Sequence, residues 1–484
     1  MIDISNLHTG LFIGGEWRDA SDNFTTLNPA TGRPLAELAA AGADDVDAAV
    51  AAATSAYRGD WGALAPSRKG AMLHKLADLV ERDLDQLAAL ESLDMGRPVG
   101  MGAALMIPNF VATLRYYAGW ADKINGELIA NDGYLGGPVP THAYTRRDPL
   151  GVVAAIVPWN APLMILGWKL APALACGNAV IIKPSEDASL SILRLAELID
   201  EAGFPPGTVN VLTGAGKVAG EALARHPRIQ KISFTGSTEV GRSILQNSAL
   251  NLKRTALELG GKAPPIIFDD ANLEAAIQAS AMGLFFNQGE VCAAGTRIIA
   301  HRKVYETVLE GLKGAAEAQT IGDPFDSATT MGPLVNARQR DRLLGYMRTG
   351  ADEGADVVTG GTAPEGPGFF VNPTVMAGRN DMSVAREEIF GPVGVVIPFD
   401  SDDEAVAMAN DNQYGLSATV WTSDVTRAHT ISAQIEAGAI GVNGWSPLAP
   451  QLPWGGVKAS GVGRELGYEG ILSYTEPKTI TIIL

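Results

Sequence analysis

The chain has 484 residues, of which 46% are hydrophobic and 19% are charged, which is typical of a folded α/β protein of two or three domains and excludes a disordered one. Its formal net charge of −17 argues against nucleic acid or an anionic membrane as a partner, because both would repel an acidic surface. Its two cysteines, Cys176 and Cys292, are too few for a disulfide framework and indicate a reducing, cytoplasmic compartment.

The N-terminal quarter of the chain is predicted to start as extended chain and to continue as helices. Asp44 is a candidate cap for a helix whose apolar residues recur every three or four positions. A longer helix is predicted from Pro66 to a stop at Gly96. The apolar patch at 11–13 has no basic residue before it, so we expect no signal peptide. Residues 127–148 are predicted to form a protruding strand pair or a connector.

The segment from Gly151 to Ile182 is the one candidate membrane span, because it is long and carries a single charge, Lys169. Pro158 and Pro162 would break any helix there. Two buried strands flanking a short helix explain the segment better, so no membrane span is predicted.

Five apolar runs are predicted to be strands, with helical patterns such as 190–202 between them. They are Val152–Val157, Ala179–Lys183, Val209–Leu212, Lys231–Phe234 and Thr255–Leu259. This alternation indicates βαβ units and a parallel sheet buried on both faces. In such sheets ligands bind beyond the carboxyl ends of the strands. The polar or glycine residues near those ends are Asn160, Lys183, Glu186, Gly214, Gly236, Ser237 and Glu258.

A second α/β region is predicted after Gly260 and Gly261. Its strands are predicted at 264–268, 297–300, 394–397, 418–421 and 439–442, and its helices at 275–285 and 304–318. The apolar tail from Thr479 to Leu484 is predicted to pair with another strand, for which a second subunit is a candidate.

Cys292 lies in a loop-like stretch, from Phe285 to Gly295, between a predicted helix and a predicted strand. A thiol at such a break can be presented to a ligand, whereas a cysteine taken alone is more often a packed structural residue. Whether Cys292 is a nucleophile therefore depends on the groups that the fold brings near it.

The stretch from Gly236 to Gly241 follows a strand and opens a helix. A glycine there allows backbone N–H groups to approach a phosphate, and the helix N-terminus adds partial positive charge. The glycine spacing is not the usual dinucleotide fingerprint, and a turn without a ligand explains it nearly as well.

Lys183 and Glu186 end the second predicted strand, where they could hold the two hydroxyls of an adenosine ribose. A surface turn with a helix cap is the alternative. If they bind the ribose, Glu186 disfavours a 2′-phosphate, because two unit charges about 4 Å apart at an effective dielectric near 20 repel by roughly 4 kcal/mol. NAD is then preferred over NADP.

Glu258 and Asn160 are the other candidates for chemistry at the strand ends. Glu258 could be a general base whose pKa is tuned by burial, and Asn160 could donate an amide N–H to a developing oxyanion. A paired structural carboxylate and a turn asparagine are the alternatives. The six histidines are scattered without ligand spacing, so no metal site is predicted.

Short motifs in this chain, taken together, resemble the NAD(P)-dependent aldehyde dehydrogenase superfamily over essentially the whole length, in its hydrolytic, non-acylating type. The motifs are Pro158-Trp159-Asn160, Lys183-Pro184-Ser185-Glu186, Phe234-Thr235-Gly236-Ser237, Leu257-Glu258-Leu259-Gly260-Gly261-Lys262, Gly289-Glu290-Val291-Cys292, Glu387-Glu388-Ile389-Phe390-Gly391-Pro392, Asn412-Gln413-Tyr414-Gly415-Leu416 and Pro453-Trp454-Gly455-Gly456-Val457-Lys458-Ala459-Ser460-Gly461. Each motif alone is weak, but their common order is highly specific.

The resemblance implies an α/β fold with two doubly wound parallel-sheet domains and a small β oligomerisation arm. The NAD-binding domain would comprise 1–126 and 149–260, and the catalytic domain 261–465. The segments 127–148 and 466–484 would form the arm, and the protein would be a homodimer or homotetramer.

The resemblance also implies a role for each candidate in the site. Cys292 would attack the aldehyde carbon as a thiolate, and the oxyanion of the thiohemiacetal would meet the Asn160 side chain and the Cys292 backbone N–H. After hydride transfer to the nicotinamide, Glu258 would activate the water that hydrolyses the thioester. Lys169 and Glu465 match positions linked to proton relay. The implied cofactor-binding residues are Ile156, Trp159, Lys183, Ser185, Glu186, Phe234, Gly236, Ser237, Val240, Leu259, Gln339, Glu388 and Phe390.

The implied aldehyde tunnel is apolar. Its residues would be Ala161, Ile165, Trp168, Phe286, Val291, Leu448 and Trp454. It has no arginine for a second carboxylate, which argues against semialdehydes of dicarboxylic acids. Ala161 stands where many relatives carry an aromatic residue, and Trp454 replaces a common phenylalanine, which together favour a medium or bulky aliphatic or aromatic aldehyde. Betaine aldehyde is an alternative, because Trp168 and Trp454 could face a quaternary ammonium.

Two further alternatives concern the activity itself. The chain could belong to the acylating branch, which passes the thioester to coenzyme A, although the apparent base Glu258 argues against that. It could also be a non-catalytic relative with a structural or binding role, although the presence of Cys292, Glu258 and Asn160 argues against that as well.

Overall fold

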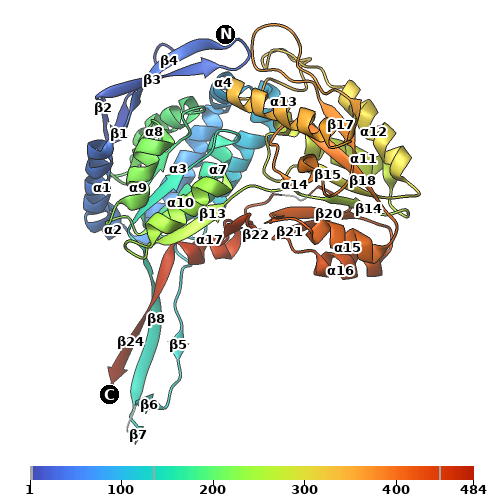
Figure 1. The fold of residues 1–484 in the computed structure, drawn as a ribbon. Coiled ribbons are helices and arrows are strands. Elements are labelled where there is room, and N and C mark those ends of the chain that lie inside the picture. Colours follow the sequence, from blue (N-terminus) through green and yellow to red (C-terminus); the bar gives the residue numbers. More distant parts are fainter. Residues whose placement is uncertain (1–3, 135–136, 446–447) are drawn as a thin grey trace.

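The computed structural model describes residues 4–134, 137–445 and 448–484, and it contains two open α/β sheets and a protruding arm (Figure 1). The first sheet has eight strands in the order β2-β1-β11-β10-β9-β12-β13-β23. Their bounds are β1 Leu11–Ile13, β2 Glu16–Arg18, β9 Val152–Ile156, β10 Ala179–Lys183, β11 Val209–Val211, β12 Lys231–Thr235, β13 Arg254–Glu258 and β23 Gly461–Val462. Strands β9 to β13 are the five predicted strands, and they pair in parallel as expected.

The register of the central strands brings their carboxyl ends to one edge of the sheet. Ile156 of β9 lies beside Lys183 of β10 on one side and beside Phe234 of β12 on the other. Thr235 in turn lies beside Glu258, the last residue of β13. The residues that follow these strands therefore share one edge, where parallel sheets bind their ligands.

Helices cover both faces of this sheet (Figure 1). They include α1 Ala43–Arg58, α3 Pro66–Arg82, α4 Leu84–Met95, α6 Ile107–Ala118, α7 Pro162–Ala175, α8 Leu190–Ala202, α9 Glu221–Arg225 and α10 Thr238–Ser248. Alternate residues of each strand enter different cores: Val153 and Val180 pack in one cluster, and Ala154 and Ile181 pack in the other. This double burial explains why the strands are continuous apolar runs rather than alternating ones.

The N-terminal helices differ from the sequence prediction in two details. The cap of α1 is Gly42, and the carboxylate of Asp45, not of Asp44, accepts a hydrogen bond from the Gly42 N–H at 2.9 Å. The predicted long helix is two helices, α3 and α4, which meet at Asp83. Gly96 ends α4 as predicted, in a left-handed conformation with φ of 82°.

The second sheet has seven strands in the order β16-β17-β18-β15-β14-β20-β21. Their bounds are β14 Pro265–Ile267, β15 Arg297–His301, β16 Asp356–Thr359, β17 Thr374–Ala377, β18 Val393–Phe399, β20 Ser417–Trp421 and β21 Ala439–Val442. The helices of this unit are α11 Leu273–Phe285, α12 Tyr305–Glu317, α13 Ala337–Asp352, α14 Ser383–Arg386, α15 Asp402–Asn410 and α16 Val425–Gln434. All pairs except that of β16 with β17 are parallel, so the predicted second α/β region is confirmed.

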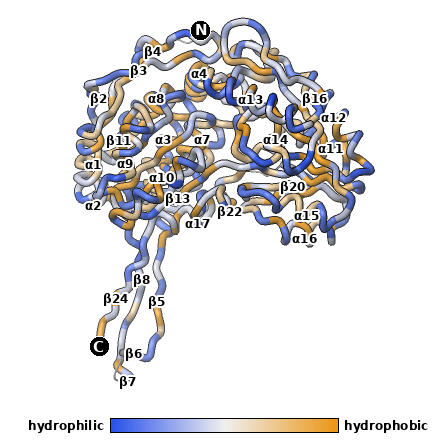
Figure 2. The backbone as a smooth tube through the Cα atoms, in the orientation of Figure 1, coloured by the Kyte–Doolittle hydropathy of each residue, from blue (hydrophilic) through white to orange (hydrophobic). Residues whose placement is uncertain are grey.

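The arm projects away from both sheets (Figure 1). It contains β5 Leu128–Ile129, β6 Gly133–Tyr134, β7 Gly137–Pro138, β8 Thr141–Pro149 and β24 Thr475–Ile483. The C-terminal strand β24 pairs antiparallel with β8 of the same chain along its whole length, so the apolar tail finds its partner strand internally. The apolar residues Leu128, Ile483 and Leu484 remain exposed on the arm, where Figure 2 shows apolar patches near the C-terminus and on β5.

Further elements belong to neither of the two large sheets nor to the arm. They are β3 Asp22–Asn28, β4 Arg33–Ala40, α2 Asp60–Ala63, α5 Val99–Met101, β19 Tyr414–Gly415, β22 Val457–Lys458 and α17 Gly467–Ser473. Across the described ranges, no helix combines the length and apolar character that a membrane span requires.

The turn at Gly96 generates a stability prediction. Gly96 and Gly203 both end helices with left-handed backbones, at φ of 82° and 83°, so alanine at either site carries a conformational cost of roughly 1 kcal/mol. A Cβ at Gly96 would also lie 2.8 Å from the carbonyl oxygen of Pro333, whereas a Cβ at Gly203 meets nothing within 4 Å. Thermal unfolding should therefore show a larger loss of Tm for Gly96→Ala than for the control Gly203→Ala. Equal losses would show that the contact with Pro333 relaxes without cost.

Candidate active site

Cys292 follows a tight backbone turn after α11. Asn287, Gln288 and Gly289 are all left-handed, with φ of 51°, 57° and 67°. A Cβ on Gly289 would lie 2.3 Å from the carbonyl carbon of Gly391, so this position requires glycine. The turn leads the chain to Cys292, which is half-buried in the wall of a cavity.

The Cys292 thiol is neutral in this environment. Burial raises its pKa to about 12, and the carboxyl groups of Glu388 and Glu258 raise it further in the same direction. The thiolate is the reactive form of a cysteine. A reaction at this sulfur therefore needs a group that removes the thiol proton.

Asn160, in the loop after β9, lines the same cavity as Cys292. Its Nδ2 donates a hydrogen bond to the carbonyl oxygen of Glu290 at 2.8 Å. An amide nitrogen has two hydrogens, so one N–H remains for another acceptor. The structure thus brings the predicted oxyanion donor and the predicted nucleophile together.

Glu258 ends β13 and is 3% exposed. Neither of its carboxyl oxygens has a hydrogen-bond partner among the described residues. Burial raises the pKa of Glu258 well above its usual range, and the negative charge of Glu465 adds to this shift, while Lys169 opposes it. A carboxyl group in this state can accept a proton near neutral pH.

Lys169 and Glu465 form a buried ion pair in which Nζ lies 2.7 Å from Oε1. Lys169 also donates to Oγ1 of Thr235 at 2.7 Å, and the hydroxyl of Ser233 donates to the same oxygen of Glu465 at 2.7 Å. The two predicted relay residues are therefore in direct contact, and their charges act on Glu258.

A cleft of about 410 Å³ lies at the carboxyl edge of the first sheet. The predicted cofactor residues that line it are Ile156, Trp159, Lys183, Ser185, Glu186, Phe234, Gly236 and Val240. The Nζ of Lys183 donates to the carbonyl oxygen of Pro184 at 2.6 Å and lies 3.9 Å from Glu186. Burial lowers the pKa of Lys183 to about 8. Sequence reasoning missed Lys217 and Arg338, which also line the cleft and belong to no motif used above.

Five predicted cofactor residues are not in this lining: Ser237, Leu259, Gln339, Glu388 and Phe390. Phe390 packs edge-to-face against Trp159 with 5.3 Å between ring centroids, and Gln339 donates to the Phe390 carbonyl oxygen at 2.6 Å. Glu388 accepts a hydrogen bond from the Gly261 N–H at 3.0 Å, and burial raises its pKa to about 7. Glu388 and Phe390 thus extend the site from the cleft toward Cys292.

All seven predicted tunnel residues line the cavity that holds Cys292, which has a volume of about 350 Å³. They are Ala161, Ile165, Trp168, Phe286, Val291, Leu448 and Trp454. Sequence reasoning missed Leu105, Met106, Asn109, Met164, Met282 and Trp445, which also line it. The missed residues come from several separate segments, and no local pattern marks them.

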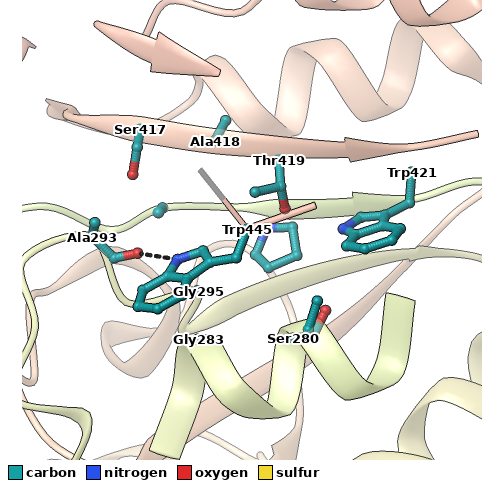
Figure 3. Close-up of a pocket in the computed structure, with 12 residues that line it drawn as sticks. Ser280, Gly283, Ala293, Gly295, Ser417, Ala418, Thr419, Trp421 and Trp445 are labelled. Atoms are coloured by element: carbon teal, nitrogen blue, oxygen red, sulfur yellow. Dashed lines mark hydrogen bonds between the residues drawn. The ribbon is translucent and has the colours of Figure 1, made fainter. Parts of the chain in front are cut away.

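Trp445 separates this cavity from a smaller void of about 10 Å³ behind the Cys292 loop. Figure 3 shows its ring between the strand that carries Thr419 and the helix that carries Ser280. Its Nε1 donates to the carbonyl oxygen of Ala293 at 3.4 Å, and its ring packs against Phe286 with centroids 5.6 Å apart. Trp445 therefore shapes the cavity and supports the residue next to Cys292.

Two parallel-sheet units with a cleft at a strand edge, and a cavity where a half-buried thiol meets an amide, define an enzyme that acts on a small molecule. Comparison with known proteins gives its family. The model of the aldehyde dehydrogenase family matches residues 17–480, and the chain belongs to that family.

The similar proteins extend over almost the whole chain. Mitochondrial aldehyde dehydrogenase of Mesocricetus auratus is 44% identical over 98% of this chain and 94% of its own length. Retinal dehydrogenase 2 of Gallus gallus is 44% identical over 98% and 92%. The structure of an aldehyde dehydrogenase from Bacillus cereus in complex with NAD+ superposes with a TM-score of 0.96 at 42% identity, covering 99% of this chain and 97% of that one. The predicted fold class and family are thereby confirmed.

The charge of Glu388 beside the thiol generates a prediction about reactivity. Glu388→Gln removes a negative charge, which lowers the pKa of Cys292 and raises its thiolate fraction. Iodoacetamide should therefore label Cys292 several-fold faster at pH 9, measured by mass spectrometry of the peptide that contains it. Glu387→Gln is the matched control, because Glu387 is exposed and does not shift the thiol. Equal labelling rates for both variants would show that the charge of Glu388 does not affect the thiol.

Proposed function

We propose that this chain oxidises an aldehyde to a carboxylic acid with reduction of NAD, through a thioester on Cys292. The observation that carries the proposal is the cavity that both Cys292 and Asn160 line. The carboxyl group of Glu258 has no hydrogen-bond partner among the described residues, and its charge contributes to the raised pKa of the Cys292 thiol. A nucleophile, an oxyanion donor and a base are the groups that acyl chemistry at a thiol requires.

NAD fits the donor set of the cleft at the first sheet. Lys183 and Glu186 would hold the adenosine ribose, Gly236 at the start of α10 would admit the pyrophosphate, and Trp159 would lie toward the nicotinamide half. Bound there, the nicotinamide would supply the hydride acceptor. The charge of Glu186 would repel a 2′-phosphate, which favours NAD over NADP, and the ratio of kcat/KM for the two cofactors measures this preference.

The first step joins the sulfur of Cys292 to the aldehyde carbon. The thiol is neutral at rest, so its proton passes to the Glu258 carboxylate as the S–C bond forms and the carbonyl electron pair moves onto oxygen. The remaining N–H of the Asn160 amide and the backbone N–H of Cys292 stabilise this oxyanion.

The second half of the reaction releases the acid. Collapse of the oxyanion with loss of hydride leaves an acyl thioester on Cys292. Glu258, once it has lost its proton, takes a proton from water, whose oxygen attacks the thioester carbon and displaces the thiolate. The ion pair of Lys169 with Glu465 gives the proton on Glu258 a polar route away from the site.

The cavity favours an apolar aldehyde of medium or bulky size. Its volume is about 350 Å³, and no arginine is among the described residues that line it, which disfavours a second carboxylate on the substrate. A quaternary ammonium aldehyde of the betaine type is the second candidate, because the rings of Trp168 and Trp454 lie 6.3 Å apart in the same cavity. A screen of aliphatic, aromatic and quaternary-ammonium aldehydes separates the two classes.

The arm favours a homodimer or homotetramer in which it bridges subunits. It carries exposed apolar residues, including Leu128, Ile483 and Leu484, on a segment that projects from both sheets (Figure 2). We assign 1–126 and 149–260 to NAD binding, 261–465 to catalysis, and 127–148 with 466–484 to the bridge. Light scattering of wild-type protein and of Leu128→Asp tests this assignment. The variant should have a lower molar mass than the wild type, and equal molar masses would count against the bridging role.

Substitution of Cys292 tests the nucleophile. Cys292→Ala should abolish NADH formation at 340 nm with every aldehyde, because no thioester can form. Cys176→Ala is the control: this second cysteine is buried near the carbonyl oxygen of Ile471 and is not among the residues that line the cavity, so its loss should leave kcat unchanged. Turnover by Cys292→Ala would rule out the covalent mechanism.

Substitution of Glu258 tests the base. Glu258→Gln should lower steady-state kcat about 100-fold or more, because hydrolysis of the thioester loses its base. Added hydroxylamine, which attacks the thioester directly, should restore part of the rate. If coenzyme A accelerates turnover of the wild-type protein, the proposed hydrolytic function is wrong and the protein belongs to the acylating branch.

A further inference from the structure

Arg97 is a fully buried arginine that sequence reasoning did not single out. It follows the left-handed Gly96 at the end of α4, where the backbone is fixed on both sides by the other sheet unit. A Cβ on Gly96 would clash with Pro333, and the Val99 N–H donates to the carbonyl oxygen of Pro324 at 2.9 Å. The position of this side chain is therefore set by contacts between the two units.

The guanidinium of Arg97 donates to three separate segments. Nη1 donates to the Glu91 carboxylate of α4 at 2.5 Å, and Nη2 donates to the backbone carbonyl oxygen of Asn160 at 2.5 Å. Nε donates to Oδ1 of Asn287 at 2.7 Å. The other carboxylate oxygen of Glu91 accepts from the Leu163 N–H at 3.1 Å, in the first turn of α7. A buried charge with partners this well arranged is costly to leave unpaired.

Further bonds connect Asn160 to the turn that leads to Cys292. Asn287 donates through Nδ2 to the carbonyl oxygen of Asn160 at 2.9 Å and to that of Glu290 at 3.3 Å. The side chain of Asn160 donates to the same Glu290 carbonyl oxygen at 2.8 Å. Arg97 thus holds the backbone of the oxyanion donor and the side chain of the left-handed residue that starts the Cys292 loop.

We propose that Arg97 is a positioning residue that locks Asn160 and the Cys292 loop into one rigid oxyanion site. Arg97 lines neither the cavity of Cys292 nor the cleft of the first sheet, so it acts through Asn160 and Asn287 rather than by touching substrate. The assignment rests on the proposed function, in which Asn160 and Cys292 stabilise an oxyanion. A displacement of about 1 Å in such a site costs about 100-fold in rate.

The test compares Arg97→Met with Arg97→Lys. Arg97→Met should lower kcat about 100-fold, while the Kd for NAD, measured by calorimetry, should change less than 2-fold because the cleft is untouched. Arg97→Lys keeps the charge but reaches fewer acceptors, so its kcat should fall between those of wild type and Arg97→Met. Hydrogen exchange of the amides at 286–295 should rise in Arg97→Met, which reports the loop without any turnover.

Arg297→Met is the matched control for the loss of a buried arginine. Arg297 is equally buried and donates to Asn380 and to the carbonyl oxygens of Met408 and Ala409, none of which lines the cavity. It should lower Tm but leave kcat per folded molecule and the exchange of 286–295 unchanged. An Arg97→Met variant with kcat within 3-fold of wild type, corrected for folded protein, overturns the proposal.

A double variant shows whether Arg97 acts by positioning Asn160 or only by packing in the core. If Arg97 acts through Asn160, Arg97→Met combined with Asn160→Ala should be no slower than Asn160→Ala alone, and additive losses overturn the proposal. Should Arg97→Met not fold, Arg97→Lys decides the matter, because it keeps the buried charge and removes the guanidinium that bonds to Asn160 and Asn287. A kcat within 3-fold of wild type in a folded Arg97→Lys then overturns the proposal. Retained turnover in Cys292→Ala would instead reject the proposed function, and the exchange measurement would still report on the loop.

Discussion

The parallel pairing of β9 with β10 and β12 is the constraint on which the rest of the site depends. Because Ile156 lies between Lys183 and Phe234, the loops that leave these strands begin at one edge of the sheet. That edge holds the cleft, and the loop after β9 carries Asn160 away from the cleft to the neighbouring cavity. A register shift of one residue would turn every strand side chain into the opposite core, so the two cores also fix the site.

The same edge concentrates buried groups whose hydrogen bonds are incomplete. Both oxygens of Glu258 and one oxygen of Glu465 have no partner among the described residues, whereas each terminal nitrogen of the buried Arg97 guanidinium has one. Unpaired buried groups lower stability, and in enzymes they gather where charge moves during the reaction. Arg97, which has a partner at each of its three guanidinium nitrogens, connects the loop of Asn160 to the loop of Asn287 close to these carboxyl groups.

The sequence predicted most of the sheets and the main part of the site for a physical reason. Strands buried on both faces are uninterrupted apolar runs such as Ala179–Lys183, and they are visible without any knowledge of their neighbours. The motif resemblance then placed the seven tunnel residues, all of which line one cavity. Helix ends were predicted less well: α3 and α4 meet at Asp83, where no glycine or proline marks the break, and the cap of α1 falls at Gly42 rather than at Asp44.

Contacts between distant segments were the hardest to predict. Arg97 bonds to residues 63 and 190 positions away, and nothing in its local sequence distinguishes it from a surface arginine. Asn287 and Gln288 adopt left-handed backbones that are uncommon outside glycine, and the hydrogen bonds of the Asn287 side chain to Arg97 and Asn160 hold the turn in place. Trp445 likewise owes its position to Ala293 and Phe286, which only the folded chain brings near it.

The lining of the cavity has a consequence for what a substrate meets. Its tryptophans are rigid plates, whereas Met106, Met164 and Met282 are unbranched thioethers that adopt many rotamers at little cost. The parts of the lining that tryptophan forms therefore have a fixed shape, whereas the parts that methionine forms can adapt to a bound molecule. The width of this cavity is therefore a range rather than a single value. The cavity would discriminate only weakly between aldehydes of a homologous series that differ by one methylene group.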